Sequence, residues 1–507
     1  MKKNIFLFAV GLIVAFFSAL NSSAQQLYHE QYRPQVHFSP KEHWVNDPNG
    51  MVYYKGVYHL FFQYYPDSTV WGPMHWGHAT SSDLIHWEQQ PIALFPDSLG
   101  YIFSGSAVVD YHNTSGFGRS GEIPLVAIFT HSDQKGADAG RNDFQNQSVA
   151  YSVDEGKTWT KYAGNPVVKN PGIIDFRDPK VMWYEAGKKW VMTLATKDRI
   201  TFYSSPNLKT WKKESEFGKE EGAHGGVWEC PDLFTLDDHG KKTWVLVVNL
   251  NPGGPNKGSA TQYFLGDFDG NKFVPYEHKI KWLDYGPDEY AGITWSNTGD
   301  RKIFLGWMSN WMYANEVPSL KWRNAMTIPR ELHIKHVGDD IYIASEPVKE
   351  LGKIENAPVV FDNIKLINGF ELSGLTKKIT PPFKLTIRSD ESKDFSLVLF
   401  NDLNEKLIIG YESKLNQYFI DRSASGKTDF KKEFAAKHIA PRFAKDSIIN
   451  LSIIFDESSA ELFADDGLTV MTEVFFPGKP YNKLYIQTEK AVTLKRLEYV
   501  NLKSIWP

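Results

Sequence analysis

Short runs of hydrophobic residues, each bounded by Gly, Asn, Asp or Pro, follow one another along most of the chain. Such runs are typical of β-strands, and we find no long helical periodicity among them. Five runs share one form, a polar or glycine-containing turn followed by a strand: 56–65, 123–131, 188–196, 242–250 and 302–310. They begin roughly 55–65 residues apart, which is the spacing of a structural repeat. The pattern therefore predicts an all-β chain with five repeating units.

A second pattern alternates with the first. A strand, a polar turn and then an aromatic residue recur in the segments that end at residues 89, 162, 213 and 276. The Asp, Asn and Gly residues of these turns indicate β-hairpins. Because both patterns recur in the same order, with several strands per unit, they favour a five-bladed β-propeller over an irregular array of sandwiches.

The pattern changes after about residue 345, where Trp disappears until Trp506. Strand-like runs at 395–400, 406–411, 417–422, 447–456 and 460–465 are separated by turn signals about every ten residues, as in a β-sandwich. We therefore predict a catalytic propeller at 25–340, a linker at 341–357 and a C-terminal β-sandwich at 358–507.

The N-terminus has the order of a secretory signal peptide. Lys2 and Lys3 precede an apolar run from Ile5 to Leu20, and small residues lead to Ala24. The run is short for a membrane span, so an anchor is the less favoured alternative. We predict cleavage after a signal peptide at 1–24 and export to the periplasm or the outside of the cell, with no membrane attachment afterwards.

Composition excludes some partners. The 507 residues include 56 Lys and Arg against 60 Asp and Glu, which gives a net charge of −4. The chain therefore has no excess of basic residues with which to bind the phosphate groups of a nucleic acid. Aromatic residues reach 14 %, with 16 Trp, which suits a core as well as stacking on sugar rings. Cys230 is the only cysteine, so no intramolecular disulfide forms. We expect no cofactor, and no metal at His75, His78 and His86, because closely spaced further ligands are missing.

Three acidic segments stand out in the propeller region: WVNDPNG at 44–50, FRDPK at 176–180 and WECPDLF at 228–234. Glu229 lies between Trp228 and Cys230, and an apolar environment raises a carboxyl pKa, as a general acid requires. The inner strands of a propeller surround one axis, so distant segments can meet at its end. Two opposed carboxyl groups are what the hydrolysis of a glycosidic bond needs, and a third can hold hydroxyl groups.

These segments resemble the signature blocks of glycoside hydrolase family 32, the β-fructofuranosidases, which include invertases, inulinases and levanases. The resemblance covers nearly the whole chain and extends to LFFQYYP at 60–66, WGPMHWGHA at 71–79, FSGSAV at 103–108, DYGPDEYAG at 284–292 and WMSNW at 307–311. It implies a propeller followed by a sandwich, and a retaining mechanism. By this resemblance Asp47 is the nucleophile, Glu229 is the acid and then the base, and Asp178 holds fructose hydroxyl groups.

The same resemblance implies a set of substrate contacts. These are Trp44, Asn46, Gln63, Trp71, Phe103, Ser104, Arg177 and Trp307. The amide side chains both donate and accept hydrogen bonds, and the aromatic rings can pack on the C–H face of a sugar, although an aromatic residue in a propeller is by default part of the core. Arg177 is expected to pair with Asp178 and keep it ionised. Cys230 is expected to be a buried structural neighbour of Glu229.

The resulting prediction is an exported, retaining fructan β-fructosidase that removes terminal fructose from levan or inulin, with sucrose as a further candidate substrate. An endo-acting levanase is the alternative within the family, and the rim of the site decides between them. A non-catalytic fructan-binding protein is disfavoured because all three acids are present, and an arabinanase because its motifs differ. A retaining pair requires the Asp47 and Glu229 carboxyls to lie roughly 5–5.5 Å apart. Linkage preference and oligomeric state stay open.

Overall fold

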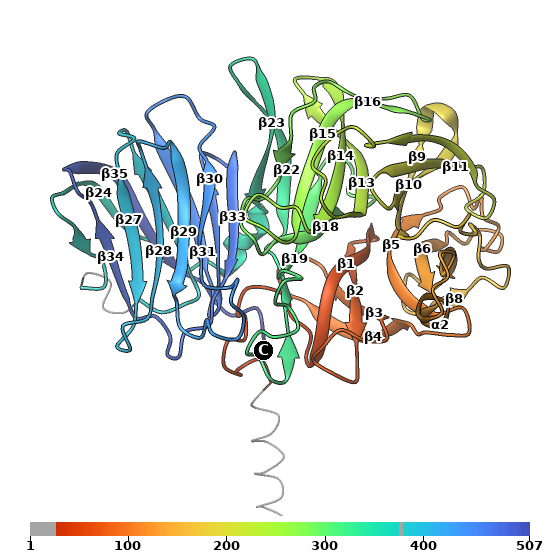
Figure 1. Cartoon of the computed structure of the whole chain (residues 1–507), viewed down its shortest axis with the longest axis horizontal. Helices are drawn as coiled ribbons and strands as arrows, with labels where there is room; N and C mark the ends of the chain where they lie inside the picture. The colour runs from red at the N-terminus through yellow and green to blue at the C-terminus, as the bar shows by residue number, and fades with distance from the viewer. Residues whose placement is uncertain (1–26, 375–378) are drawn as a thin grey trace, which may run out of the picture.

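The computed structural model describes residues 27–374 and 379–507, so the predicted signal peptide lies outside the described residues. Two β-rich bodies lie side by side, a ring of five sheets and a two-layered sandwich (Figure 1). This arrangement confirms the predicted five-bladed propeller followed by a sandwich. Within the described residues, no helix is both long enough and apolar enough to cross a membrane.

Each blade is an antiparallel sheet whose strands follow one another from the axis outwards. Blade 1 consists of β1 (His43–Tyr54), β2 (Val57–Tyr65), β3 (His75–Ser81) and β4 (Glu88–Leu94). Blade 2 consists of β5 (Tyr101–Val109), β6 (Leu125–Ser132), β7 (Gln145–Ser152) and β8 (Thr160–Lys161), with the short helix α2 (Gln134–Asp138). Blade 3 consists of β9 (Phe176–Tyr184), β10 (Lys189–Thr196), β11 (Ile200–Ser205) and β12 (Lys212–Phe217), with the 3-10 turn η1 (Glu185–Gly187).

Blade 4 consists of β13 (Val227–Asp238), β14 (Lys241–Asn251), β15 (Ala260–Phe268) and β16 (Phe273–Pro275), and β17 (Lys281–Trp282) also pairs with β15. Blade 5 consists of β18 (Tyr290–Thr294), β19 (Ile303–Met308), β22 (Arg330–Val337) and β23 (Asp340–Pro347), with β21 (Ala325–Met326) on β19. The strand β20 (Trp322–Arg323) leaves blade 5 and pairs in parallel with β1, which links the last blade to the first.

The five repeated runs are the second strands of the five blades, and the alternating pattern forms the third and fourth strands of blades 1 to 4. Three of these hairpins share one turn design. An Asp or Asn accepts hydrogen bonds from backbone N–H groups of the turn, as Asn207 does from Lys209 and Thr210. The Trp that follows donates its indole N–H to a turn carbonyl, as Trp211 does to Leu208 at 3.1 Å. This explains why a Trp recurs after the polar turns of blades 1 to 3.

All five inner strands carry a β-bulge at the same level. The irregular pairs lie between Val45 and Pro48, Ile102 and Gly105, Arg177 and Lys180, Glu229 and Asp232, and Tyr290 and Ile293. Proline favours such a break because it has no N–H to donate to the neighbouring strand, and Pro48, Pro179 and Pro231 lie at these bulges. In the last three blades the bulge contains a residue in the left-handed region: Asp178, Cys230 or Ala291. The bulges redirect side chains toward the axis, and all three acidic motifs contain one.

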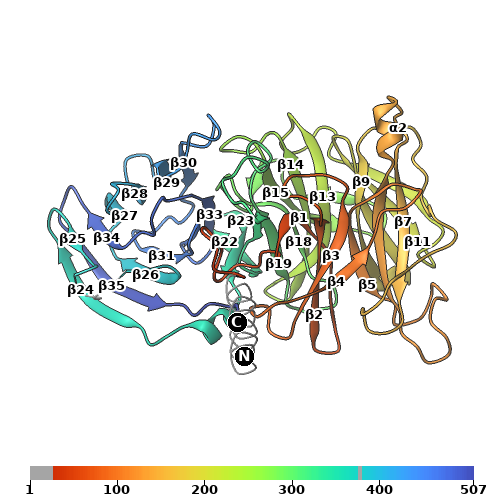
Figure 2. The same ribbon diagram turned by 90° about the horizontal axis from the view of Figure 1, so that it is seen from below.

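The sandwich consists of two six-stranded antiparallel sheets. One has the order β24 (Val359–Leu366), β35 (Val492–Asn501), β26 (Phe383–Ser389), β31 (Ile449–Phe455), β32 (Ser459–Ala464) and β33 (Thr469–Val474). The other has the order β25 (Phe370–Glu371), β34 (Lys483–Gln487), β27 (Phe395–Phe400), β28 (Lys406–Glu412), β29 (Gln417–Ala424) and β30 (Lys437–Pro441). The two sheets form the two layers of the C-terminal body (Figure 2). Their inner faces share one hydrophobic core.

The predicted linker, 341–357, overlaps the outer strand of blade 5. Strand β23 pairs with β22 over its whole length, and Ile343 is buried in the core that blades 4 and 5 share. The alternation of hydrophobic residues in this segment therefore reflects a strand. The chain crosses to the sandwich through residues 348–358, which include the 3-10 turn η2 (Lys349–Ile354).

Buried ion pairs join the sandwich to the propeller. Arg330 of blade 5 donates to Asp284 at 2.8 Å and, across the interface, to Glu461 at 3.1 Å. Arg422 of the sandwich donates to Asp288 at 2.5 Å. Because isolated buried charges are costly, Glu461 and Asp288 each depend on an arginine of the other domain, and these two pairs specify how the two bodies dock.

Candidate active site

A pocket of about 300 Å³ lies at one end of the propeller axis, where the bulges of the inner strands converge. It is lined by Asn46, Asp47, Gln63, Trp71, Phe103, Ser104, Gln145, Arg177, Asp178, Glu229 and Trp311. The structure thus brings the three acids into one pocket, together with six of the eight predicted contacts. The exceptions are Trp44 and Trp307.

Asp47 lies in the bulge of β1 and is held by two side-chain donors. Asn46 donates to its Oδ1 at 2.9 Å, and Ser104 of β5 donates to its Oδ2 at 2.6 Å. Trp44 in turn donates its indole N–H to Asn46 at 2.7 Å. These bonds give each oxygen of the Asp47 carboxyl group a donor and fix its orientation.

Glu229 lies on β13, opposite Asp47 in the ring of blades. Arg177 donates to its Oε1 through Nη2 at 2.8 Å and through Nε at 3.1 Å, and the Tyr290 hydroxyl donates to its Oε2. Burial raises the pKa of Tyr290 well above its ordinary value, so the hydroxyl stays protonated and remains a donor. Both carboxylate oxygens of Glu229 are therefore positioned.

Asp178 is the most confined of the three acids. Its side chain is 5 % exposed, and its Oδ2 accepts the backbone N–H of Cys230 at 3.1 Å. Burial raises the pKa of Asp178 to about 7; Arg177 opposes the rise, and the nearby carboxylates of Glu229 and Asp47 add to it. The expected pairing with Arg177 is loose, at 3.9 Å, because the guanidinium directs its hydrogen bonds to Glu229 and Asp175.

Cys230 connects the three acids. It follows Glu229 in the chain, and its Sγ lies 3.5 Å from Oδ2 of Asp47 and 3.6 Å from Oδ2 of Asp178. Burial raises the pKa of the Cys230 thiol well above its ordinary value, and the adjacent carboxylates reinforce the effect. The side chain is therefore a neutral S–H donor between the carboxylates, in agreement with the expected structural role.

Aromatic residues form one wall of the pocket. Trp71 and Phe103 meet edge to face with ring centroids 6.1 Å apart. Trp44 and Trp307 are fully buried and pack against Trp311, with centroids 5.9 and 4.8 Å from its ring. Their contact with substrate stays a prediction, and in this structure they support the Trp that lines the pocket.

Three residues of the site were not among the predicted ones. Trp311 closes the segment WMSNW, in which sequence reasoning selected Trp307; nothing in a motif with two Trp residues says which ring reaches the pocket. Tyr290 lies in the quoted segment DYGPDEYAG, but only the fold brings it to Glu229. Gln145 comes from a segment with no motif and accepts hydrogen bonds from Arg177 and from the backbone of Phe176.

The histidines considered for a metal have other partners. His78 pairs with His59 at 3.1 Å, His75 faces the Pro73 carbonyl, and His86 pairs with Asp83. Within the described residues, one group has metal-ligand spacing: Asp238, His239 and His336, on hairpins outside the pocket.

The pocket has the parts for cleaving a glycosidic bond. Asp47 offers an oriented carboxylate, Glu229 a second carboxyl on another blade, and Asp178 a third, buried carboxyl in the same pocket. A carboxyl pair of this kind can attack an anomeric carbon and exchange a proton with the leaving oxygen.

Known proteins share this architecture. The family model described as the glycosyl hydrolases family 32 N-terminal domain matches residues 37–347, and the family 32 C-terminal model matches residues 358–501. A levanase of Bacillus subtilis is 45 % identical over 525 residues, covering 100 % of this chain and 76 % of the levanase. An extracellular exo-inulinase of Aspergillus niger is 38 % identical over 519 residues, covering 94 % of this chain and 96 % of the inulinase.

The crystal structure of an exo-inulinase from Aspergillus awamori superposes with a TM-score of 0.86 at 36 % identity, covering 94 % of this chain and all of the inulinase. Both domains, in the same order, are thus found in these relatives. The two family models together match most of the chain, and we conclude that it belongs to glycoside hydrolase family 32.

Proposed function

We propose that the chain is a fructan β-fructosidase that hydrolyses levan or inulin by a retaining mechanism. Membership of the family and the similarity to a levanase and to exo-inulinases support the reaction class and the substrate class. The observation that carries the mechanism is the meeting of Asp47 and Glu229, from blades 1 and 4, in one pocket.

In the first step, the Asp47 carboxylate attacks the anomeric carbon of the terminal fructosyl residue. Glu229 transfers its proton to the oxygen that leaves with the rest of the chain, and the new ester bond replaces the broken glycosidic bond. In the second step, the Glu229 carboxylate takes a proton from water, whose oxygen attacks the same carbon and frees Asp47. Two inversions give net retention.

The neighbouring groups hold these carboxyls for their tasks. Ser104 and Asn46 donate to the two oxygens of Asp47 and hold its carboxyl group in one orientation for the attack. Arg177 and Tyr290 orient Glu229 toward the pocket. Asp178 accepts hydrogen bonds from hydroxyl groups of the bound fructosyl ring. These hydrogen bonds become stronger as positive charge develops on the ring in the transition state.

The size of the pocket supports removal of terminal fructose. A volume of about 300 Å³ is at the lower end of the range for small-molecule sites, which suits a chain end rather than the middle of a polymer. Trp71, at 37 % exposure, stands at the mouth, where it can pack against the next sugar along the chain.

Export through the predicted signal peptide is part of the proposal. It rests on the charged, apolar and small-residue order of residues 1–24, and the extracellular inulinase relative supports it.

Product analysis over time on levan, inulin and sucrose, with purified residues 25–507, tests the proposal. Fructose alone from the first minutes is the expected result, and the relative rates assign the linkage preference. Early oligosaccharides would instead establish endo action. No product from any of the three substrates would overturn the proposed activity.

A further inference from the structure

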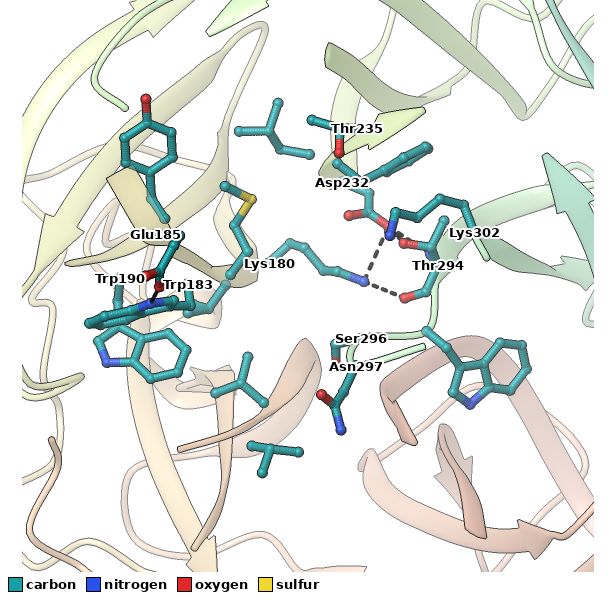
Figure 3. A pocket seen from close by; sticks show the side chains of 18 of the residues that line it. Lys180, Trp183, Glu185, Trp190, Asp232, Thr235, Thr294, Ser296, Asn297 and Lys302 are labelled. Atoms are coloured by element: carbon teal, nitrogen blue, oxygen red, sulfur yellow. Dashed lines mark hydrogen bonds and ion pairs between the residues drawn. The ribbon is translucent and has the colours of Figure 1, made fainter. Parts of the chain in front are cut away.

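A larger pocket lies at the other end of the propeller axis. It has a volume of about 520 Å³ and is formed by the inner strands of blades 2 to 5, beyond their bulges (Figure 3). We call it the far pocket and define it by Lys180, Trp183, Glu185, Asp232, Trp244 and Lys302. None of these residues lines the active-site pocket.

The two pockets are separate compartments. A void of about 10 Å³ lies between them, bordered by Asp178 on the side of the active site and by Lys180 on the side of the far pocket. This void is far too small for a sugar ring. A ligand in the far pocket therefore cannot reach the reacting carbon, and any role of the pocket is in binding.

The floor of the far pocket is polar and buried. Lys180 contacts Oδ2 of Asp232 at 3.1 Å and donates to the carbonyl of Thr294, as Figure 3 shows. The Thr294 hydroxyl and backbone N–H also donate to Oδ2 of Asp232, at 2.7 and 2.6 Å. The other oxygen of Asp232 has no hydrogen-bond partner, although the residue is only 1 % exposed. A buried carboxylate oxygen without a donor indicates a place where a ligand hydroxyl can bind.

The walls of the far pocket are aromatic. Trp183 and Trp244 are half-buried and lie on blades 3 and 4. Trp183 is fixed because its indole N–H donates to Glu185 at 2.7 Å and its ring meets Trp190 edge to face. In Figure 3, Trp183 and Glu185 stand across the pocket from Thr294 and Lys302. Flat apolar faces opposite polar groups suit the C–H face and the hydroxyl edge of a sugar ring.

The charges of the far pocket favour a neutral ligand. Lys180, Lys242 and Lys302 contribute three cations against the two carboxylates of Asp232 and Glu185, and Lys180 is already paired with Asp232. A phosphate would meet the unpartnered oxygen of Asp232, so a polyhydroxylated neutral molecule fits better than an anion.

We propose that the far pocket is a second, non-catalytic saccharide-binding site for one or two residues of the fructan substrate. This inference rests on the proposed function, because the polymer to be held is the one that the active site shortens. A polymer bound in the far pocket stays at the enzyme between turnovers. Binding of a trisaccharide in the far pocket does not help its hydrolysis. Loss of the site is therefore expected to raise KM for the polymer alone.

Binding stoichiometry tests the inference directly. Equilibrium dialysis of the full-length Glu229→Gln protein against an inulin-derived trisaccharide, up to millimolar concentration, is expected to give two molecules per chain. Adding Trp183→Ala is expected to leave one, and Trp183→Phe, which keeps an aromatic face, to restore the second. Trp211→Ala removes a half-buried Trp from the same blade, outside both pockets, and is the matched control.

Kinetics give a second measurement. With an active Glu229, Trp183→Ala is expected to raise KM for levan or inulin polymer at least threefold, with kcat unchanged and with the trisaccharide kinetics unchanged. A stoichiometry of one in the Glu229→Gln protein would overturn the inference and leave the proposed function intact. Failure of the unmodified protein to hydrolyse any fructan would overturn the proposed function instead, whatever the stoichiometry.

Discussion

The three acids of the pocket differ in their immediate partners, and these partners separate their tasks. Asp47 receives neutral donors, Glu229 receives a cation and a phenol, and Asp178 receives a backbone N–H in the most buried position. Three carboxyl groups in one pocket can therefore be suited to the three different tasks proposed for them. Apart from Asn46, which precedes Asp47 in the chain, these partners come from other blades and not from the sequence neighbours of each acid.

Replacement of Glu229 tests the proton donor. Glu229→Gln keeps the shape and polarity of the side chain but has no proton to give, so levan turnover is expected to fall about 10²–10⁴-fold. Substrate binding, measured by dialysis, is expected to persist. Fructosides with good leaving groups lose less, since they need little protonation. Glu220→Gln, at an exposed position, is the control, and unchanged levan turnover in Glu229→Gln would refute the assignment.

Replacement of Asp178 tests whether this buried carboxyl group lowers the stability of the folded protein. Because the folded-state pKa of about 7 exceeds the ordinary value of 3.8, the folded protein holds a proton that the unfolded chain releases, and stability falls as pH rises between these values. Asp178→Asn removes this penalty. We expect its melting temperature to exceed that of the unmodified protein by a few degrees at pH 8, with the difference vanishing near pH 4.

The same variant is expected to lose activity about 100-fold or more, because an amide is a poorer acceptor for hydroxyl groups than a carboxylate. Melting curves across the pH range and kcat/KM on inulin are the measurements. If the stability of Asp178→Asn relative to the unmodified protein were lower at pH 8 than at pH 4, burial of the Asp178 carboxyl group would not be destabilising.

At the scale of the element, two structural devices recur from blade to blade in this chain. The outer hairpins use an Asp or Asn turn followed by a Trp, and the inner strands use a bulge. The first device is local, so it can be recognised in the sequence. The second is a mismatch between paired strands, so it becomes visible only when the partner strand is known, although the prolines of the acidic motifs are consistent with it.

Asn and Asp are expected to be interchangeable as the side-chain hydrogen-bond acceptor of these hairpin turns. Asn207→Ala removes four hydrogen bonds, from the Ser205 hydroxyl, the Lys209 backbone and the Thr210 backbone and hydroxyl, and is expected to cost about 1–2 kcal/mol of stability. Asn207→Asp is expected to cost less than about 0.5 kcal/mol, because Asp83 and Asp154 hold the equivalent turns of blades 1 and 2. Denaturant unfolding measures both. Equal destabilisation by the two substitutions would contradict this account.

At the scale of the whole molecule, the sandwich completes the charge balance of the propeller. His37 is buried between Asp456 and Glu461 of the sandwich, at 2.7 and 2.8 Å. Burial lowers the pKa of His37, but the two carboxylate partners outweigh it and raise the pKa to about 9. A charged imidazolium therefore joins the domains at neutral pH, and the propeller alone would leave such groups without partners.

This linkage has a predictable pH dependence. A folded-state pKa above the ordinary value of 6.5 means that the contribution of His37 is complete below pH 6.5 and is lost as pH rises through about 9. The unmodified protein is expected to lose stability across this window. His37→Gln is expected to be less stable at pH 6 by about 3–5 kcal/mol and to lack most of the slope. Denaturant unfolding from pH 6 to 10 measures both, and identical slopes would refute the role of His37.

The sequence predicted the repeat and the fold class, which the structure confirms, and it selected three acids that the structure brings into one pocket; their catalytic roles stay a prediction. Strand periodicity, turn chemistry and short motifs depend on residues within about ten positions of one another, and the backbone geometry of a strand or turn follows from them. The sequence did not predict Trp311 or Gln145, because each of them lines the pocket only through the position of its strand or loop in the ring of blades.

Local chemistry therefore defined which elements form and which residues could react, whereas the closed ring decided how they meet. The pairing of Arg177 with Glu229 rather than chiefly with Asp178, the raised pKa of Asp178, and the packing of Trp311 against Trp44 all depend on contacts between blades. The docking of the sandwich through Arg330 and Arg422 joins residues more than 100 positions apart. Such contacts arise only when the whole chain packs, since burial and proximity are properties of the assembled core.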